Sequence, residues 1–140
     1  MGKIDSRKVL VGGLVAGVVL NVIDFLCYGV IFAKTFPTQP GAQGLFGIPL
    51  MLWFVIMDFL YGIALVYMYA AIRPRFGAGP RTAVMTGLLV WIFVGLLHAL
   101  GEAPVAMGAP REYYTIGTLI ALVALPVGTL VGAKFYTESA

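Results

Sequence analysis

One apolar run, residues 9–32, is long enough to cross a membrane and carries an aspartate within it. A membrane-spanning helix needs about 20 consecutive apolar residues. A carboxylate inside such a helix costs roughly 2.5–3.5 kcal/mol on insertion scales. Asn21 and Asp24 are three residues apart and share one face of the helix. We therefore expect Asp24 to lie against another polar group rather than against lipid.

The composition of the whole chain is that of a membrane protein. Of its 140 residues, 61% are hydrophobic and 11% are charged, against about 45–50% and 25% in soluble domains. This length and composition predict a single transmembrane domain over residues 1–140, with no room for a separate soluble catalytic domain. The function is therefore more consistent with a non-enzymatic protein than with an enzyme.

Four apolar segments, separated by proline- and glycine-rich loops, predict the fold. The expected helices cover about residues 9–32, 48–72, 82–101 and 112–136. In particular, Arg73-Pro74 is expected to end the second helix. The fold class predicted is all-α: an integral membrane four-helix bundle with up-down-up-down topology.

The lysines and arginines predict the orientation of this bundle. Basic residues in short loops favour the cytoplasmic side of a membrane. One side of the predicted bundle carries seven of the nine lysines and arginines, and the other side carries Lys34 and Arg111. The seven are Lys3, Arg7, Lys8, Arg73, Arg75, Arg81 and Lys134. Both termini and the loop between Arg73 and Arg81 are therefore predicted to be cytoplasmic.

Two short segments carry a resemblance to known proteins. Residues 28–34 read Tyr-Gly-Val-Ile-Phe-Ala-Lys, and residues 70–83 contain the basic loop from Arg73 to Arg81. They resemble the end of the first helix and the central basic loop of small four-helix bacterial inner-membrane proteins of unknown function. This resemblance implies a multi-pass protein of the bacterial inner (cytoplasmic) membrane, and it implies no catalytic residue and no substrate.

The polar residues of the predicted spans gather in the outer half of the bundle. A helix rises about 1.5 Å per residue, which puts Asp24 and Asp58 at similar depths, roughly 12–15 Å below the outer surface. His98 and Glu102 are four residues apart near the outer end of the third helix, and share a face. The predicted intramembrane polar site consists of Asn21, Asp24, Asp58, His98, Glu102 and Thr118.

Three interpretations of this polar site remain open from the sequence. It can be structural, with hydrogen bonds between helices; it can be a proton or cation pathway, a common use of intramembrane carboxylates; or it can hold a metal. Asp24, Asp58, His98 and Glu102 are candidate ligands for iron, zinc or manganese. No cofactor is identified by the sequence.

The preferred function is a non-enzymatic homo-oligomer or accessory subunit of a larger bacterial membrane complex. The alternative is a small proton- or cation-coupled carrier that uses Asp24 and Asp58, and a metal- or cofactor-binding membrane protein is third. The expected partners are the lipid bilayer and other membrane subunits. The basic loop is explained by topology and anionic lipid rather than by nucleic acid.

Two pairs of glycines predict how the first and last helices pack. Gly13 and Gly17 lie at the same depth in the first helix as Gly128 and Gly132 in the last. Small residues four apart let two backbones approach closely and gain dispersion contacts. We expect these two motifs to face each other in the inner half, and the outer half to be splayed around Asp24.

Overall fold

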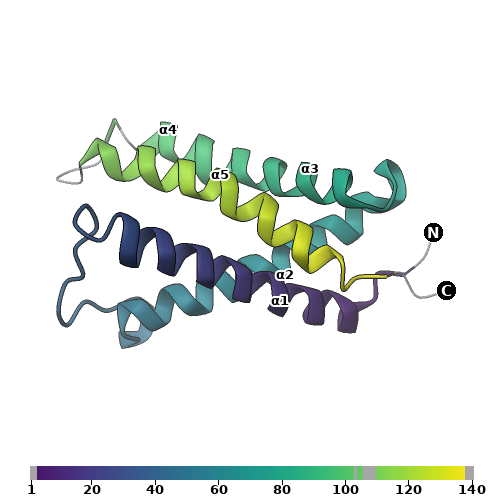
Figure 1. The fold of residues 1–140 in the computed structure, drawn as a ribbon, viewed down its shortest axis with the longest axis horizontal. Helices are drawn as coiled ribbons and strands as arrows, with labels where there is room; N and C mark the ends of the chain where they lie inside the picture. The colour runs from purple at the N-terminus through teal and green to yellow at the C-terminus, as the bar shows by residue number, and fades with distance from the viewer. Residues whose placement is uncertain (1–2, 103, 106–109, 138–140) are drawn as a thin grey trace.

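The computed structural model describes residues 3–102, 104–105 and 110–137, and these form an all-α bundle of four long spans (Figure 1). The first span is α1 (Ser6–Asp24), which continues as the π-helix η1 (Phe25–Ile31). The second is α2 (Leu50–Phe76). The third runs through α3 (Pro80–Trp91), the π-helix η3 (Ile92–Leu97) and α4 (His98–Glu102), and the fourth is α5 (Arg111–Ala133). The predicted fold class is confirmed.

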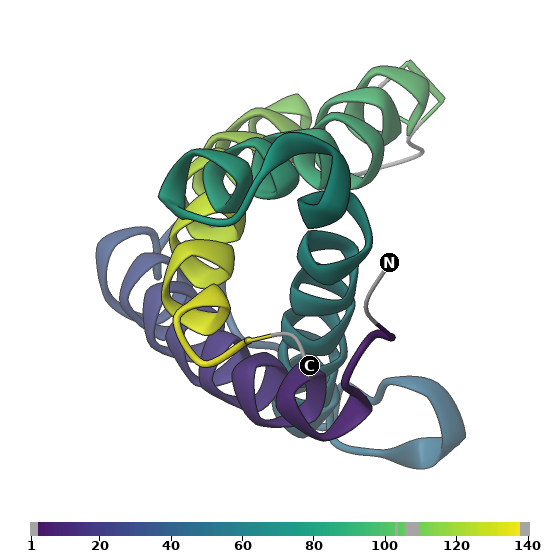
Figure 2. The same cartoon turned by 90° about the vertical axis from the view of Figure 1, so that its right-hand side faces the viewer.

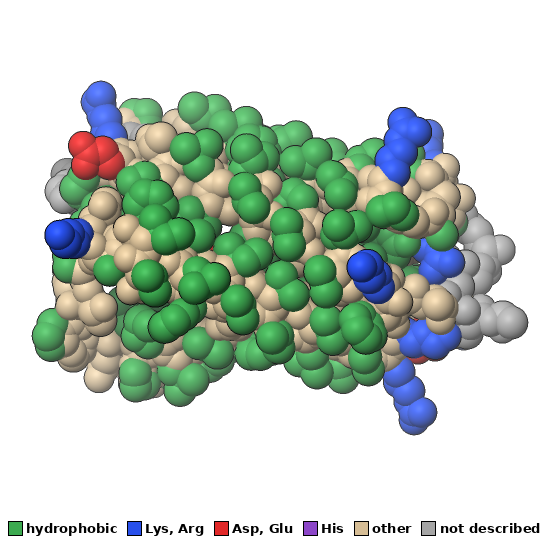
Figure 3. All heavy atoms as spheres, viewed as in Figure 1, with side chains coloured by type: hydrophobic (Ala, Val, Ile, Leu, Met, Phe, Trp, Pro, Cys, Tyr) green, Lys and Arg blue, Asp and Glu red, His purple; other side chains and the backbone are tan. Residues whose placement is uncertain are grey.

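All four spans are long and apolar enough to cross a membrane. Consecutive spans alternate in direction, so both chain ends lie at one end of the bundle, which we call the terminal end (Figure 1). The opposite end carries the loop of residues 33–49 and is called the loop end. On the face shown in Figure 3, hydrophobic side chains cover the middle, and lysines and arginines lie toward the two ends.

The first helix begins earlier than predicted because an acidic residue caps it. The Asp5 carboxylate accepts hydrogen bonds from the backbone N–H groups of Arg7 and Lys8, at 3.0 and 3.2 Å. An aspartate in this position satisfies N–H groups that have no partner within the helix. The helix therefore starts at Ser6 rather than at about residue 9.

The expected end of the second helix at Arg73-Pro74 was wrong. α2 continues through Pro74 and ends at Phe76, before Gly77 with its positive φ of 86°. Proline removes a single backbone donor, and here it does so within the last turn. Glycine is the residue that reaches positive φ without strain, so Gly77 ends the helix.

The last helix ends three residues before the predicted position. After Ala133 the backbone forms tighter bonds, from Lys134, Phe135 and Tyr136 N–H to carbonyls three residues earlier. This turn brings the Tyr136 side chain back into the bundle, where it is 3% exposed.

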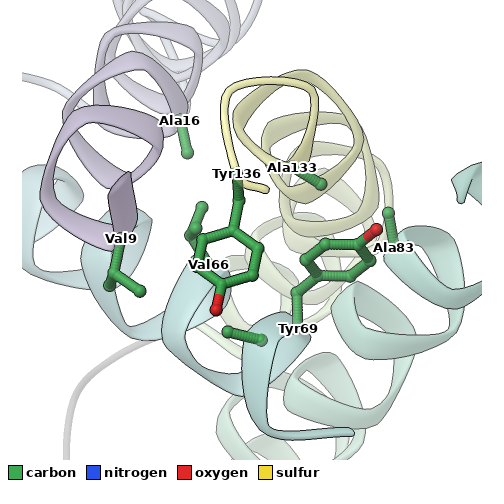
Figure 4. Close-up of a cluster of buried hydrophobic side chains, with 8 residues drawn as sticks. Val9, Ala16, Val66, Tyr69, Ala83, Ala133 and Tyr136 are labelled. Atoms are coloured by element: carbon green, nitrogen blue, oxygen red, sulfur yellow. The ribbon is translucent and has the colours of Figure 1, made fainter. Parts of the chain in front are cut away.

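The spans form a ring in the order α1, α2, α3, α5, as the end-on view of Figure 2 shows. α1 therefore packs against both α2 and α5. At the terminal end, buried side chains from these helices surround Tyr136 (Figure 4). A second cluster, of Leu20, Leu65, Ala124 and Leu125, lies next along the bundle.

Burial stops abruptly beyond this second cluster. In the part of the chain that the structure describes, α1 has its last buried residue at Leu20 and α2 its first at Gly62. α5 has its first buried residue at Ile120, and η1 has none. Gly95 is the buried residue of the third span nearest the loop end. The bundle is thus tightly packed toward the terminal end and loosely packed toward the loop end.

The orientation of this bundle in a membrane is a prediction that labelling can test. In a Cys27→Ala background, we expect a cysteine at Ala78 to react with thiol reagents only from the cytoplasm. A cysteine at Thr38, in the exposed loop at the other end, should react with an impermeant reagent from outside. Both positions are exposed, so a lack of reaction is not due to burial. Reversed labelling would overturn the orientation based on basic residues.

Candidate functional site: a carboxyl pair between two helices

Asp24 and Asp58 lie together between the first two spans. Asp24 is the last residue of α1, four residues after the buried Leu20, and Asp58 is four residues before the buried Gly62. Positions four apart share a helix face, so both carboxyls point to the packed side of their helices. The two carboxyl groups are close enough to interact directly. The two aspartates therefore lie at the boundary between the packed and the loosely packed halves.

A hydrogen bond between two carboxyl groups has a chemical requirement. Ionised carboxylates accept hydrogen bonds but cannot donate them. Asp24 and Asp58 can therefore share a hydrogen bond only when one of them holds a proton. A shared proton also avoids two like charges side by side in a medium of low dielectric constant. The pair can thus hold one proton, or release it and leave room for a cation.

Asn21 links the two helices that carry the pair. Its side-chain amide donates to the backbone carbonyls of Gly17, at 2.9 Å, and of Val55 on α2, at 3.4 Å. The amide thus ties α1 to α2 one turn from the carboxyl pair. Neither bond is to an aspartate, so Asn21 acts on the site through the spacing of the helices.

The α-helix changes to a π-helix directly after Asp24. The N–H of Phe32 donates to the carbonyl of Cys27, five residues earlier, at 2.8 Å. The third span makes the same change at η3, before His98. π-Helical turns are rare and occur often at functional sites. The apolar residues of these two segments do not differ from those of an ordinary α-helix, so the sequence does not predict these turns.

Tyr28 is a member of this region that the sequence analysis missed. It follows Asp24 by four residues, and both carboxyls lie within electrostatic range of its hydroxyl. Its side chain crosses to α5, where a Cβ on Gly117 would be 3.3 Å from the hydroxyl oxygen. Its ring also packs edge-on against Phe36, with 4.9 Å between centroids. The four-residue spacing from Asp24 was the available sequence signal.

The other predicted site residues do not join the carboxyl pair. His98 and Glu102 are exposed near the loop end of the third span. Thr118 contributes through its backbone, since its carbonyl accepts a hydrogen bond of 2.8 Å from the Trp91 indole. No three histidine, cysteine, aspartate or glutamate residues form a metal-binding group among the residues described. The four candidate metal ligands therefore do not make one site here.

The glycine motifs pack differently from the predicted pairing. Gly128 and Gly132 do face α1, but they meet Leu20, Gly12 and Ala16. The predicted partners, Gly13 and Gly17, instead face α2.

The predicted pairing was wrong because small residues lie on two neighbouring faces of α1. A Cβ on Gly12 would lie 2.6 Å from the Gly132 carbonyl oxygen, and a Cβ on Gly13 would lie 2.8 Å from the Ile63 side chain. One step along a helix rotates by about 100°. Residues 12 and 16 thus form a second small-residue stripe, one position away from residues 13 and 17.

These features define a class of protein: a small multi-pass helical membrane protein with a carboxyl pair between its first two spans. Neither a family model, nor a curated protein, nor a solved structure matches this chain. Its function must therefore be inferred from the site itself.

Proposed function

We propose that the protein is a small proton- or cation-coupled membrane carrier, whose ion-binding site is the Asp24–Asp58 pair. The observation that carries this proposal is that two carboxyl groups from neighbouring spans lie together within the bundle. Intramembrane carboxylates are costly, and they commonly mark ion pathways and proton relays. A pair that shares one proton carries a single negative charge, and its release leaves two adjacent carboxylates, which favours the return of a proton or the binding of a cation.

The uneven packing of the bundle supports the same function. On the loop side, the pair borders helices whose described residues are only partly buried or exposed. On the terminal side, the packed cluster of Leu20, Leu65 and Leu125 separates it from the other end. A carrier needs a site that communicates with one side at a time, and looser packing on the loop side than on the terminal side is consistent with access from the loop side.

Proton flux into vesicles tests the proposal. The protein is reconstituted with an internal pH-sensitive dye, and a potassium diffusion potential drives protons inward. Wild-type vesicles should acidify, whereas Asp24→Asn and Asp58→Asn should fall to the rate of protein-free vesicles. Glu112→Gln, at the exposed start of α5, is the matched control and should keep the wild-type rate. Repeating the assay with sodium or potassium gradients identifies a coupled cation.

Two outcomes contradict this function. One is wild-type flux no greater than that of protein-free vesicles under every ion gradient. The other is full flux in both aspartate variants after their folding has been verified by size-exclusion chromatography.

A second candidate is a non-enzymatic accessory subunit or homo-oligomer of a larger membrane complex. It is favoured by the loop half of the bundle, where exposed apolar side chains such as Phe25, Ile31 and Phe93 could pack against another subunit. Extraction from native membranes in a mild detergent, followed by mass determination, separates the two candidates. A stable assembly combined with absent flux would favour the accessory role.

A further inference from the structure

We propose that the Tyr28 hydroxyl is the relay through which the Asp24–Asp58 pair exchanges its proton with the loop end of the bundle. This inference deepens the proposed function, because it assigns the route by which that same site is reached. Tyr28 would be a relay residue that lies outside the ion-binding pair itself.

The position of Tyr28 supports this role. It lies on η1, about one helical turn beyond Asp24 toward the loop end. Its hydroxyl makes no hydrogen bond to any described residue, so its donor and acceptor positions are not taken up by another described side chain or backbone group. It follows Asp24 by four residues, a spacing that places two side chains on the same side of a helix. A tyrosine hydroxyl can donate and accept a hydrogen bond at once, which a relay requires.

The surroundings of Tyr28 fix the hydroxyl in one place. Its ring packs against Phe36, and Phe36 in turn packs against Tyr113, with 4.6 Å between the latter two ring centroids. Gly117 has no side chain, and this leaves space on α5 for the hydroxyl. The three rings therefore connect η1, the following loop and the start of α5, beside the route out of the pair.

The proton transfer needs only water besides these groups. The carboxyl O–H of the pair passes its proton through a water molecule to the Tyr28 oxygen, while the Tyr28 O–H passes its own proton to a water molecule on the loop side, which becomes hydronium. The tyrosine is neutral before and after the step. The pair is left ionised until a proton returns by the same route or a cation replaces it.

Hydrogen–deuterium exchange of the carboxyl proton tests this route without measuring transport. The full chain in lipid nanodiscs is moved from H₂O to D₂O, and the infrared band of the protonated carboxyl is followed with time. Loss of this band in Asp24→Asn and Asp58→Asn assigns it to the pair. We expect Tyr28→Phe to slow exchange by about tenfold or more, since a positioned proton-transfer group typically contributes at least that much.

Two further variants separate a relay from simple packing. Gly117→Val keeps the hydroxyl but displaces it, because even a Cβ would lie 3.3 Å from its oxygen; exchange should slow here too. Tyr113→Phe removes a hydroxyl from the same group of rings and should exchange at the wild-type rate. Tyr28→Phe retains the ring that contacts Phe36, so its fold should be preserved.

The outcomes distinguish this inference from the proposed function. If Tyr28→Phe exchanges as fast as wild type or faster, the relay is wrong, whatever the flux assay shows. If the wild-type band is absent, the pair holds no proton and the relay is also wrong. If exchange slows in Tyr28→Phe but vesicles show no flux, the relay stands and the carrier function fails.

Discussion

Gly62→Leu should abolish the folded monomer. A Cβ at position 62 would collide with the backbone of α1, at the carbonyl oxygen of Gly13 and the amide nitrogen of Gly17. Overpacking a well-packed core typically costs about 1–3 kcal/mol, and more where the obstacle cannot rotate away. Here the obstacle is backbone, so α1 and α2 must separate and lose the close contact that small residues provide. Size-exclusion chromatography and thermal unfolding in detergent measure the loss.

A matched substitution shows whether the effect comes from this contact. Gly101→Leu places the same side chain on a helical residue whose Cβ would meet no described atom outside its own stretch of helix within 4 Å, and this variant should unfold at the wild-type temperature. If Gly62→Leu instead yields a folded monomer and dissociates an oligomer, the glycine serves assembly. That result would overturn the packing described for α1 and α2.

Replacing both aspartates of the pair should destabilise the protein by less than the sum of the two single replacements. Asp24→Leu leaves the Asp58 carboxyl without its partner, and an unsatisfied buried polar group costs about 1–3 kcal/mol. In the double variant with Asp58→Leu, neither carboxyl remains to be satisfied. We expect a coupling energy of about 0.5–3 kcal/mol between the two positions. Reversible unfolding of the four proteins in detergent or bicelles measures it.

Two comparisons make this double-mutant cycle specific. Asp24→Asn should be milder than Asp24→Leu, because an amide can still donate a hydrogen bond to the Asp58 carboxylate. Glu112→Leu combined with Asp58→Leu should be additive, since Glu112 lies at the exposed start of α5. Strict additivity of the two aspartates would mean that they do not interact in the folded protein.

The four spans and the depth of the two aspartates could be predicted because they depend on hydrophobicity and on the constant rise of a helix. The pairing of glycines could not be predicted in the same way. Two small-residue stripes overlap on α1, at residues 12 and 16 and at residues 13 and 17, and the sequence pattern does not tell which neighbour each stripe meets.

Other features of the site depend on local backbone geometry that leaves little trace in the sequence. The π-helix η1 follows Asp24 without a proline, and its residues Phe25–Ile31 read like any apolar helix. The position of Tyr136 depends on a tightened turn after Ala133. His98 and Glu102 share a helix face as predicted, but that face is exposed, because the third span has few buried residues near the loop end.

The pairing of Asp24 and Asp58 within consecutive spans has a consequence for biosynthesis. α1 and α2 are neighbours in the chain, so both carboxyls, the Asn21 amide bonds and the Gly62 contact are available once these two spans have been made. A single span entering lipid with an unpaired carboxylate is penalised. The first two spans should therefore enter the bilayer as a hairpin, and α5 should later dock on the second stripe of α1.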